Sequence, residues 1–341
     1  MKLNYNSLHK SCITFTKIIN IHIFLGCLLI FNLFILTGCN PKKEEKLIEN
    51  EKIRVVTTIG MITDIVRNVG GDKLEVIGMM GPGVDPHLYK PTLKDIERLK
   101  SASIIFYNGL HLESKMGDKL EQLSGNTKVV AVSENIPTNQ LLKSPEFKGQ
   151  YDPHIWFDIN LWIKAVETVH DTLVDYNSES KATFGENTEN YISKLRVLHE
   201  YVIKQSERVP PQQRVLVTAH DAFNYFGNAY GFEVRGLQGM STVSEAGIAD
   251  VKELASYIAE HKIPAIFVES SVPVRSLEAV KAAVISKGFN VEIGGELFSD
   301  AMGNEGTPEG TYIGMVRHNI DTIISALLGE SIEIDSYKKE Q

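Results

Sequence analysis

A long stretch without proline occupies the middle of the chain, at residues 183–208. Its apolar residues recur at the spacing of one helical face. They are Phe184, Tyr191, Leu195, Leu198 and Val202. A helix over this range would be roughly 39 Å long, and the pair Pro210–Pro211 ends it. A helix of this length in mid-chain predicts a rigid connector between two domains, which we place at residues 53–182 and 209–330.

Short apolar and β-branched runs alternate with segments of helical spacing on both sides of this connector. Strands are predicted at 53–58, 74–80, 104–107 and 129–132, and again at 214–218, 232–237, 265–269 and 289–293. A Gly-rich loop is predicted at 294–310 and a last helix at 311–328. Such alternation predicts an α/β fold with mainly parallel sheets and right-handed crossovers.

The first 40 residues differ from the rest of the chain. Three lysines are their only charged residues, and an apolar run at 18–36 is followed by Leu-Thr-Gly-Cys, ending at Cys39. This order predicts a secretory signal over residues 1–38. The four-residue ending resembles a bacterial lipobox, which implies cleavage before Cys39 and lipid on its sulfur. Alternatively, the apolar run approaches the length of a membrane anchor that is not cleaved. Residues 39–52 are polar and predict a tether.

Charge and cysteine content argue against a nucleic-acid-binding protein and against a protein stabilised by internal disulfides. The formal net charge of -8 argues against nucleic-acid binding. Of the three cysteines, Cys12 and Cys27 lie in the predicted signal, so the mature chain would keep Cys39 alone. It can then form no internal disulfide, even in an oxidising compartment. Its stability must come from its hydrophobic cores.

The tripeptide Asp-Pro-His occurs twice, ending at His87 and at His154. Proline fixes its own φ and holds the preceding residue extended, so each imidazole stands on stiff backbone in a predicted loop. His220 and Asp300 follow later predicted strands. Because ligands of open parallel sheets bind beyond the carboxyl ends of the strands, two such sheets facing each other would form one shared site. We expect these four side chains to meet there.

Three imidazoles and a carboxylate suit zinc, and they also suit manganese or iron. Because imidazoles bind metal when neutral, affinity should fall as the pH drops through about 6.5.

Each histidine has an alternative role as a structural residue. Asp85 and Asp152 either orient ligand imidazoles or only form the turn before proline. The remaining histidines of the mature chain are expected to lie at the surface or to pack within the protein. One of them, His111, supports the site indirectly at most. The other four are His170, His199, His261 and His318.

Three segments resemble the TroA-like metal-binding lipoproteins of ABC importers: Thr218–Thr242, Pro264–Ser271 and Gly294–Gly303. The resemblance extends from about Arg54 to Leu328. It implies two (β/α)4 domains joined by one long helix, with a single Zn²⁺ or Mn²⁺ held between them as the transported ligand. Carried over residue by residue, it implies the ligands His87, His154, His220 and Asp300.

The third ligand position varies within this family. Manganese-specific relatives carry glutamate where this chain has His220. Zinc-specific relatives with histidine there often insert a His-rich and acidic loop in the first domain. Residues 112–151 contain no histidine, so the chain lacks such a loop.

The resemblance implies a monomeric receptor, anchored by lipid on the outer side of the cytoplasmic membrane or in the periplasm. It would capture the metal and deliver it to an ABC permease in the membrane, without catalysing a reaction. Two alternatives remain at this point: a surface adhesin and a metal-dependent hydrolase. Four protein ligands argue against the hydrolase, because catalytic zinc normally keeps one position open for water.

Overall fold

The computed structural model describes residues 52–123, 125, 127–143 and 149–330. The predicted signal peptide, Cys39 and the tether up to residue 51 lie outside the described residues. Among the helices that are described, none is both long enough and apolar enough to cross a membrane.

A four-stranded sheet forms the N-terminal half of the described chain, residues 52–180. Its strands are β1 (Ile53–Thr57), β2 (Leu74–Gly78), β3 (Ile104–Tyr107) and β4 (Lys128–Ala131). They are all parallel, in the order β2-β1-β3-β4. The central position of β1 explains why Val55 and Val56 are fully buried. The predicted parallel α/β arrangement is confirmed in this half.

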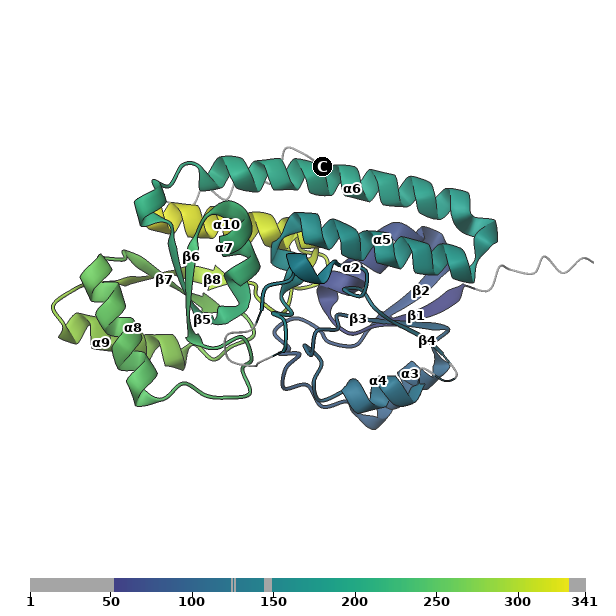
Figure 1. Cartoon of the computed structure of the whole chain (residues 1–341), viewed down its shortest axis with the longest axis horizontal. Coiled ribbons are helices and arrows are strands. Elements are labelled where there is room, and N and C mark those ends of the chain that lie inside the picture. Colours follow the sequence, from purple (N-terminus) through teal and green to yellow (C-terminus); the bar gives the residue numbers. More distant parts are fainter. Residues whose placement is uncertain (1–51, 124, 126, 144–148, 331–341) are drawn as a thin grey trace, which may run out of the picture. The chain divides into compact units, whose positions relative to one another are not determined.

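Helices cover both faces of this sheet (Figure 1). They are α2 (Gly60–Gly70), α3 (Leu93–Ser101), α4 (Gly117–Leu123) and α5 (Ile159–Tyr176). On one face α2 packs on β1 and β2 and contacts α5, while α3 contacts β1 and α4 contacts β4. A capping box between Thr92 and Asp95 begins α3. Asp158 caps α5 by accepting from the Asn160 amide.

The helix predicted in mid-chain is present as α6 (Lys181–Ser206), and the five apolar residues that predict it are all buried. It packs on α2 and α5 in the N-terminal half and on α10 in the C-terminal half, residues 207–330. Figure 1 shows it running alongside both. The division into domains at 53–182 and 209–330 stays a prediction.

The C-terminal half contains two pairs of parallel strands in place of one regular sheet. The strands are β5 (Val215–His220), β6 (Glu233–Gln238), β7 (Ala265–Glu269) and β8 (Glu292–Leu297). The pairs are β5–β6 and β7–β8, and β5 lies beside β7. The helices are α7 (Asn224–Tyr230), α8 (Ile248–His261), α9 (Arg275–Ser286) and α10 (Tyr312–Leu328). Of these, α8 and α9 pack on each other, and α10 packs on β7 and β8.

The predicted position of the last strand, 289–293, is wrong. The strand starts at Glu292 and runs through Gly294 and Gly295, which the sequence places in a loop. A Cβ on Gly294 would lie 2.6 Å from the Ala326 Cβ, and one on Gly295 would lie 2.6 Å from the Thr322 Cγ2. These glycines therefore mark the close approach of α10 to the strand.

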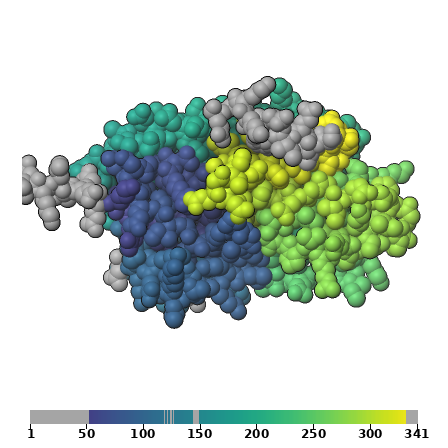
Figure 2. Space-filling view, turned by 180° about the vertical axis from the view of Figure 1, so that it is seen from behind, coloured from purple at the N-terminus to yellow at the C-terminus, as the bar shows by residue number. Residues whose placement is uncertain are grey.

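One hydrophobic core extends through both halves. It includes side chains from β1, α2, α5 and α6, and continues into α7, α10 and Phe267 of β7. A second core lies between the strands of the C-terminal half and helices α8 and α9. At the surface, Arg67 forms an ion pair with Glu305 (2.9 Å). In Figure 2 the yellow-green segment that follows β8 meets the purple N-terminal surface. The two halves are thus packed together over a shared interior.

Candidate metal centre

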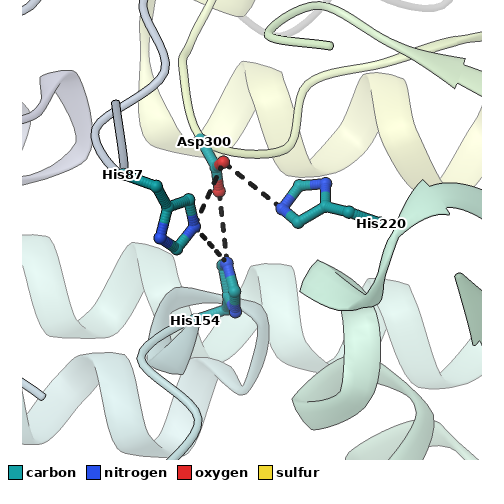
Figure 3. Close-up of side chains that lie close together, drawn as sticks. All are labelled: His87, His154, His220 and Asp300. Carbon is teal, nitrogen blue, oxygen red and sulfur yellow. Dashed lines mark hydrogen bonds and ion pairs between the residues drawn. The ribbon is translucent and has the colours of Figure 1, made fainter. Parts of the chain in front are cut away.

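The four side chains singled out in the sequence lie together in the structure (Figure 3). One potential ligand atom from each of His87, His154, His220 and Asp300 lies within 4.8 Å of all the others. The Asp300 carboxylate is 3.6, 3.4 and 3.3 Å from the Nε2 atoms of His87, His154 and His220. The Nε2 atoms of His87 and His154 are 3.3 Å apart. None of the four residues is more than 2% exposed.

Each of the four side chains comes from a different loop or strand end. His87 lies between β2 and α3, and His154 directly precedes the short 3-10 helix at 155–157. His220 is the last residue of β5, where the sequence predicts the strand to end two residues earlier, and Asp300 follows β8 by three residues. Three of them thus lie at or beyond the carboxyl ends of parallel strands, where ligands of such sheets bind.

A buried carboxylate orients His154. Asp152 Oδ1 accepts from the His154 backbone N–H (2.9 Å) and from the ring Nδ1 (2.7 Å). Asn224 Nδ2 donates to the other oxygen of Asp152 (3.1 Å). With Nδ1 held in this way, the ring presents Nε2 to the cluster. Of the two roles considered for Asp152, the orienting one is therefore present.

Glu269 orients His220 in the same way that Asp152 orients His154. Its Oε1 accepts from the His220 backbone N–H (2.8 Å), and its Oε2 lies 2.6 Å from the ring Nδ1. Sequence reasoning missed this residue. The available signal was a glutamate that ends the otherwise apolar strand Ala265–Glu269, a strand that is buried along its whole length.

His87 is held differently. Asp85 Oδ1 accepts from the His87 backbone N–H (2.8 Å), while Asp85 Oδ2 accepts from the Thr242 hydroxyl (2.5 Å). Among the described residues, no carboxylate contacts the Nδ1 of the His87 ring. Asp85 therefore shapes the turn rather than orienting the imidazole, in agreement with the second role considered for it.

The carboxylates shift the pKa values of the cluster. Burial lowers the pKa of His154, but Asp152 and Asp300 outweigh it and raise that pKa to about 9. Burial is likewise outweighed at His220, whose pKa Glu269 and Asp300 raise well above its usual value. Burial lowers the pKa of His87 to about 3, because Asp300 offsets it only in part. In the metal-free cluster the carboxylates therefore favour the protonated forms of His154 and His220, whereas burial favours the neutral form of His87.

Burial would raise the pKa of Asp300, but its neighbours reverse that effect. The charge of His220 and hydrogen bonds from His154 and His220 hold the pKa of this carboxyl well below its usual range. The carboxylate is therefore ionised and available to a cation.

The other histidines of the described chain lie outside the cluster. His111 is exposed, with a φ of 66°, and does not support the site. The remaining four lie on helices and are exposed or half-buried, as expected for surface or packing residues: His170 on α5, His199 on α6, His261 on α8 and His318 on α10. Trp156 and Trp162 are fully buried, as expected for core residues. The Trp156 ring also packs edge-on against His154, at 5.2 Å between centroids.

The fold and the cluster together define an α/β protein with a buried group of side chains that can hold a divalent metal ion. The family model for ZnuA, zinc-uptake complex component A periplasmic, matches residues 55–326. The chain therefore belongs to the ZnuA family, and the resemblance found in the sequence is confirmed.

Individual relatives agree with this membership. The chain is 53% identical to the zinc-binding protein TroA of Treponema pallidum over 273 residues, 80% of this chain and 88% of TroA. It is 46% identical to the manganese-binding lipoprotein MntA of Bacillus subtilis over 298 residues, 87% of this chain and 97% of MntA. The solved structure of periplasmic TroA from Treponema pallidum matches with a TM-score of 0.79, covering 81% of this chain and 99% of TroA.

Proposed function

We propose that this protein captures Zn²⁺ or Mn²⁺ outside the cytoplasm and delivers it to an ABC permease in the membrane. His87, His154, His220 and Asp300 are the proposed ligands, and the protein acts as a monomer. The observation that carries the proposal is the buried cluster itself, in which three imidazole Nε2 atoms surround one carboxylate. The names of the relatives support both metals, since TroA is a zinc-binding protein and MntA a manganese-binding one.

The donor set favours binding over catalysis. Four protein ligands complete a tetrahedral site, whereas a catalytic zinc normally keeps one position for water. We therefore propose that the protein is not an enzyme. Metal analysis of protein purified from its own host, together with metal uptake by a strain that lacks it, tests the function. Normal uptake of both metals in that strain would contradict a role in import.

Each chain is expected to bind one metal ion and to release protons as it does so. Below pH 9 the ion must displace the proton of His154, whose pKa is about 9, and that of His220, whose pKa is also raised. Affinity should therefore rise with pH toward 9, by about tenfold per pH unit for each proton released. The pH range over which affinity changes therefore lies above about 6.5, the ordinary pKa of an imidazole.

Calorimetry in buffers of different ionisation enthalpy measures both the stoichiometry and the protons released. Two protons per ion at pH 7 is the expected result. Several sites of similar affinity, or binding that does not change between pH 6.5 and 9, would contradict the assignment of His154 and His220 as ligands.

Anchoring to the membrane rests on Cys39, which lies outside the described residues. We propose that lipid is attached to its sulfur and that the signal is cleaved immediately before this residue. Replacement Cys39→Ser should abolish incorporation of a labelled fatty acid and impair maturation, because no other cysteine remains in the mature chain. Incorporation at the wild-type level in the variant would show that the lipobox interpretation is wrong.

A further inference from the structure

The backbone adopts a left-handed conformation for three consecutive residues after β3. Gly109, Leu110 and His111 have φ values of 82°, 53° and 66°. Glycine tolerates this conformation, whereas leucine and histidine adopt it at a cost in backbone strain. The turn is closed by the Leu112 N–H, which donates to the Gly109 carbonyl (3.1 Å). Strain of this kind persists where the surrounding structure holds it in place, and it is most frequent at functional sites.

The side chain that holds this turn is Glu113. Its Oε1 accepts from the Asn108 backbone N–H (2.7 Å) and from the Thr58 hydroxyl (2.7 Å), while its Oε2 accepts from the Gly109 N–H (3.3 Å). The residue is 3% exposed. Burial raises the pKa of the Glu113 carboxyl, and these hydrogen bonds oppose that effect in part. A buried carboxyl bound by neutral donors is costly, so its presence indicates a constraint other than stability.

Asn108 connects the turn to the metal cluster. This residue directly follows β3 and is fully buried. Its Nδ2 donates to the Pro153 carbonyl (2.9 Å) and to the Gly109 carbonyl (3.1 Å), and its own carbonyl accepts from the Ser133 hydroxyl (2.6 Å). Because Pro153 directly precedes His154, the Asn108 amide binds the peptide group that carries a proposed ligand.

The peptide group between Pro153 and His154 is thereby held on both sides. Asn108 binds its carbonyl, and Asp152 Oδ1 accepts from its N–H (2.9 Å). Asp152 is itself bound to the C-terminal half, because Tyr225 donates to its backbone carbonyl (3.0 Å). Asn108 is therefore the contact through which the end of the N-terminal sheet fixes the backbone of His154.

We infer that Asn108 and Glu113 are positioning residues for the proposed ligand His154. Glu113 holds the left-handed turn, the turn places the Asn108 amide against the Pro153 carbonyl, and the amide fixes the backbone from which the imidazole extends. The distance from His154 Nε2 to the Asp300 carboxylate, 3.4 Å, depends on this support. Both residues act through the backbone and not as ligands. The inference rests on the proposed function, since it concerns the same metal site.

The test uses Co²⁺ in place of zinc, because the visible absorption of bound cobalt reports the number and geometry of its ligands. Asn108→Ala should shift the cobalt absorption bands and lower their intensity. It should also weaken zinc binding by about tenfold, as for the loss of a residue that supports a ligand. Glu113→Ala should have the same effects. Glu113→Gln keeps an oxygen that can accept from the Asn108 N–H, so it should retain bands close to those of the wild type. An absorption titration and a competition titration against a chelator measure the two effects.

Asn187→Ala is the matched control. It removes an amide that donates to the Val69 carbonyl (3.0 Å) and joins α6 to the end of α2. This variant should lower the free energy of unfolding, leave the cobalt bands unchanged and keep zinc affinity within about twofold.

The outcomes separate this inference from the proposed function. Wild-type protein that binds one ion, with unchanged bands and unchanged zinc affinity in Asn108→Ala, would overturn the inference alone. Equal changes in Asn187→Ala would overturn it too, since the effect would then be one of general stability. Wild-type protein that binds neither metal would overturn the proposed function and the inference with it. Asn108→Ser, whose side chain is too short to reach Pro153, provides the same comparison if Asn108→Ala does not fold.

Discussion

Replacement of Asp300 by asparagine is expected to weaken zinc binding by at least about 100-fold. Asp300 is the one proposed ligand that lies within 3.6 Å of all three imidazoles, and it is 1% exposed. Asparagine keeps the shape of the side chain but removes the charge that faces the ion. Removing one partner of a buried charge pair costs on the order of 3–5 kcal/mol. A competition titration against a chelator of known affinity measures the loss.

A second carboxylate provides the control for this experiment. Asp64 accepts a hydrogen bond from Tyr191 (2.6 Å) and belongs to no metal-ligating group within the described residues. Asp64→Asn should therefore leave zinc affinity unchanged within about twofold. If Asp300→Asn bound zinc as tightly as this control does, the cluster would not be the metal site.

Substitutions of His220 are expected to have the next largest effects, and they separate affinity from selectivity. His220→Ala should weaken zinc and manganese alike, by about 100-fold, because it removes a ligand and leaves the Glu269 carboxylate buried without its partner. His220→Glu supplies a hard oxygen and a negative charge, so the ratio of zinc to manganese affinity should move toward manganese.

Glu269 complicates the second of these substitutions. Its Oε2 lies 2.6 Å from the His220 Nδ1, so a glutamate at position 220 would place two carboxylates side by side. We expect His220→Glu to lower the free energy of unfolding of the metal-free protein, and the added change Glu269→Gln to restore much of it. Competition titrations with both metals in one buffer measure the ratio. Full affinity in His220→Ala, with an unchanged ratio in His220→Glu, would contradict the assignment of His220.

The sequence predicts most of the fold, because segments with a strongly periodic pattern of apolar residues form the expected helices and strands in the structure. The last helix, predicted at 311–328, is present at Tyr312–Leu328, and the helix in mid-chain is displaced by two residues. The four residues of the cluster also follow from the sequence. The repeated Asp-Pro-His identifies His87 and His154, whereas His220 and Asp300 depend more on the family resemblance, because no local spacing links them.

What the sequence does not reveal depends on contacts between distant segments. The strand through Gly294 and Gly295 is hidden because glycine is a poor strand former, and the helix that packs closely on it lies about 30 residues later in the chain. The role of Glu269 is hidden in the same way. Its partner His220 is 49 residues away, and the two meet only because β5 lies beside β7.

The carboxylates behind His154 and His220 have a consequence for the order in which the protein folds and is loaded. In the metal-free chain, the carboxylates favour the protonated forms of both imidazoles. Positive charge on these imidazoles then faces the buried acids Asp152, Glu269 and Asp300 in the absence of an ion. We expect the chain to fold where metal is scarce, with protons on these imidazoles in place of the ion. Folding and metal binding would then be separate steps, unlike in small zinc domains that remain unfolded without their ion.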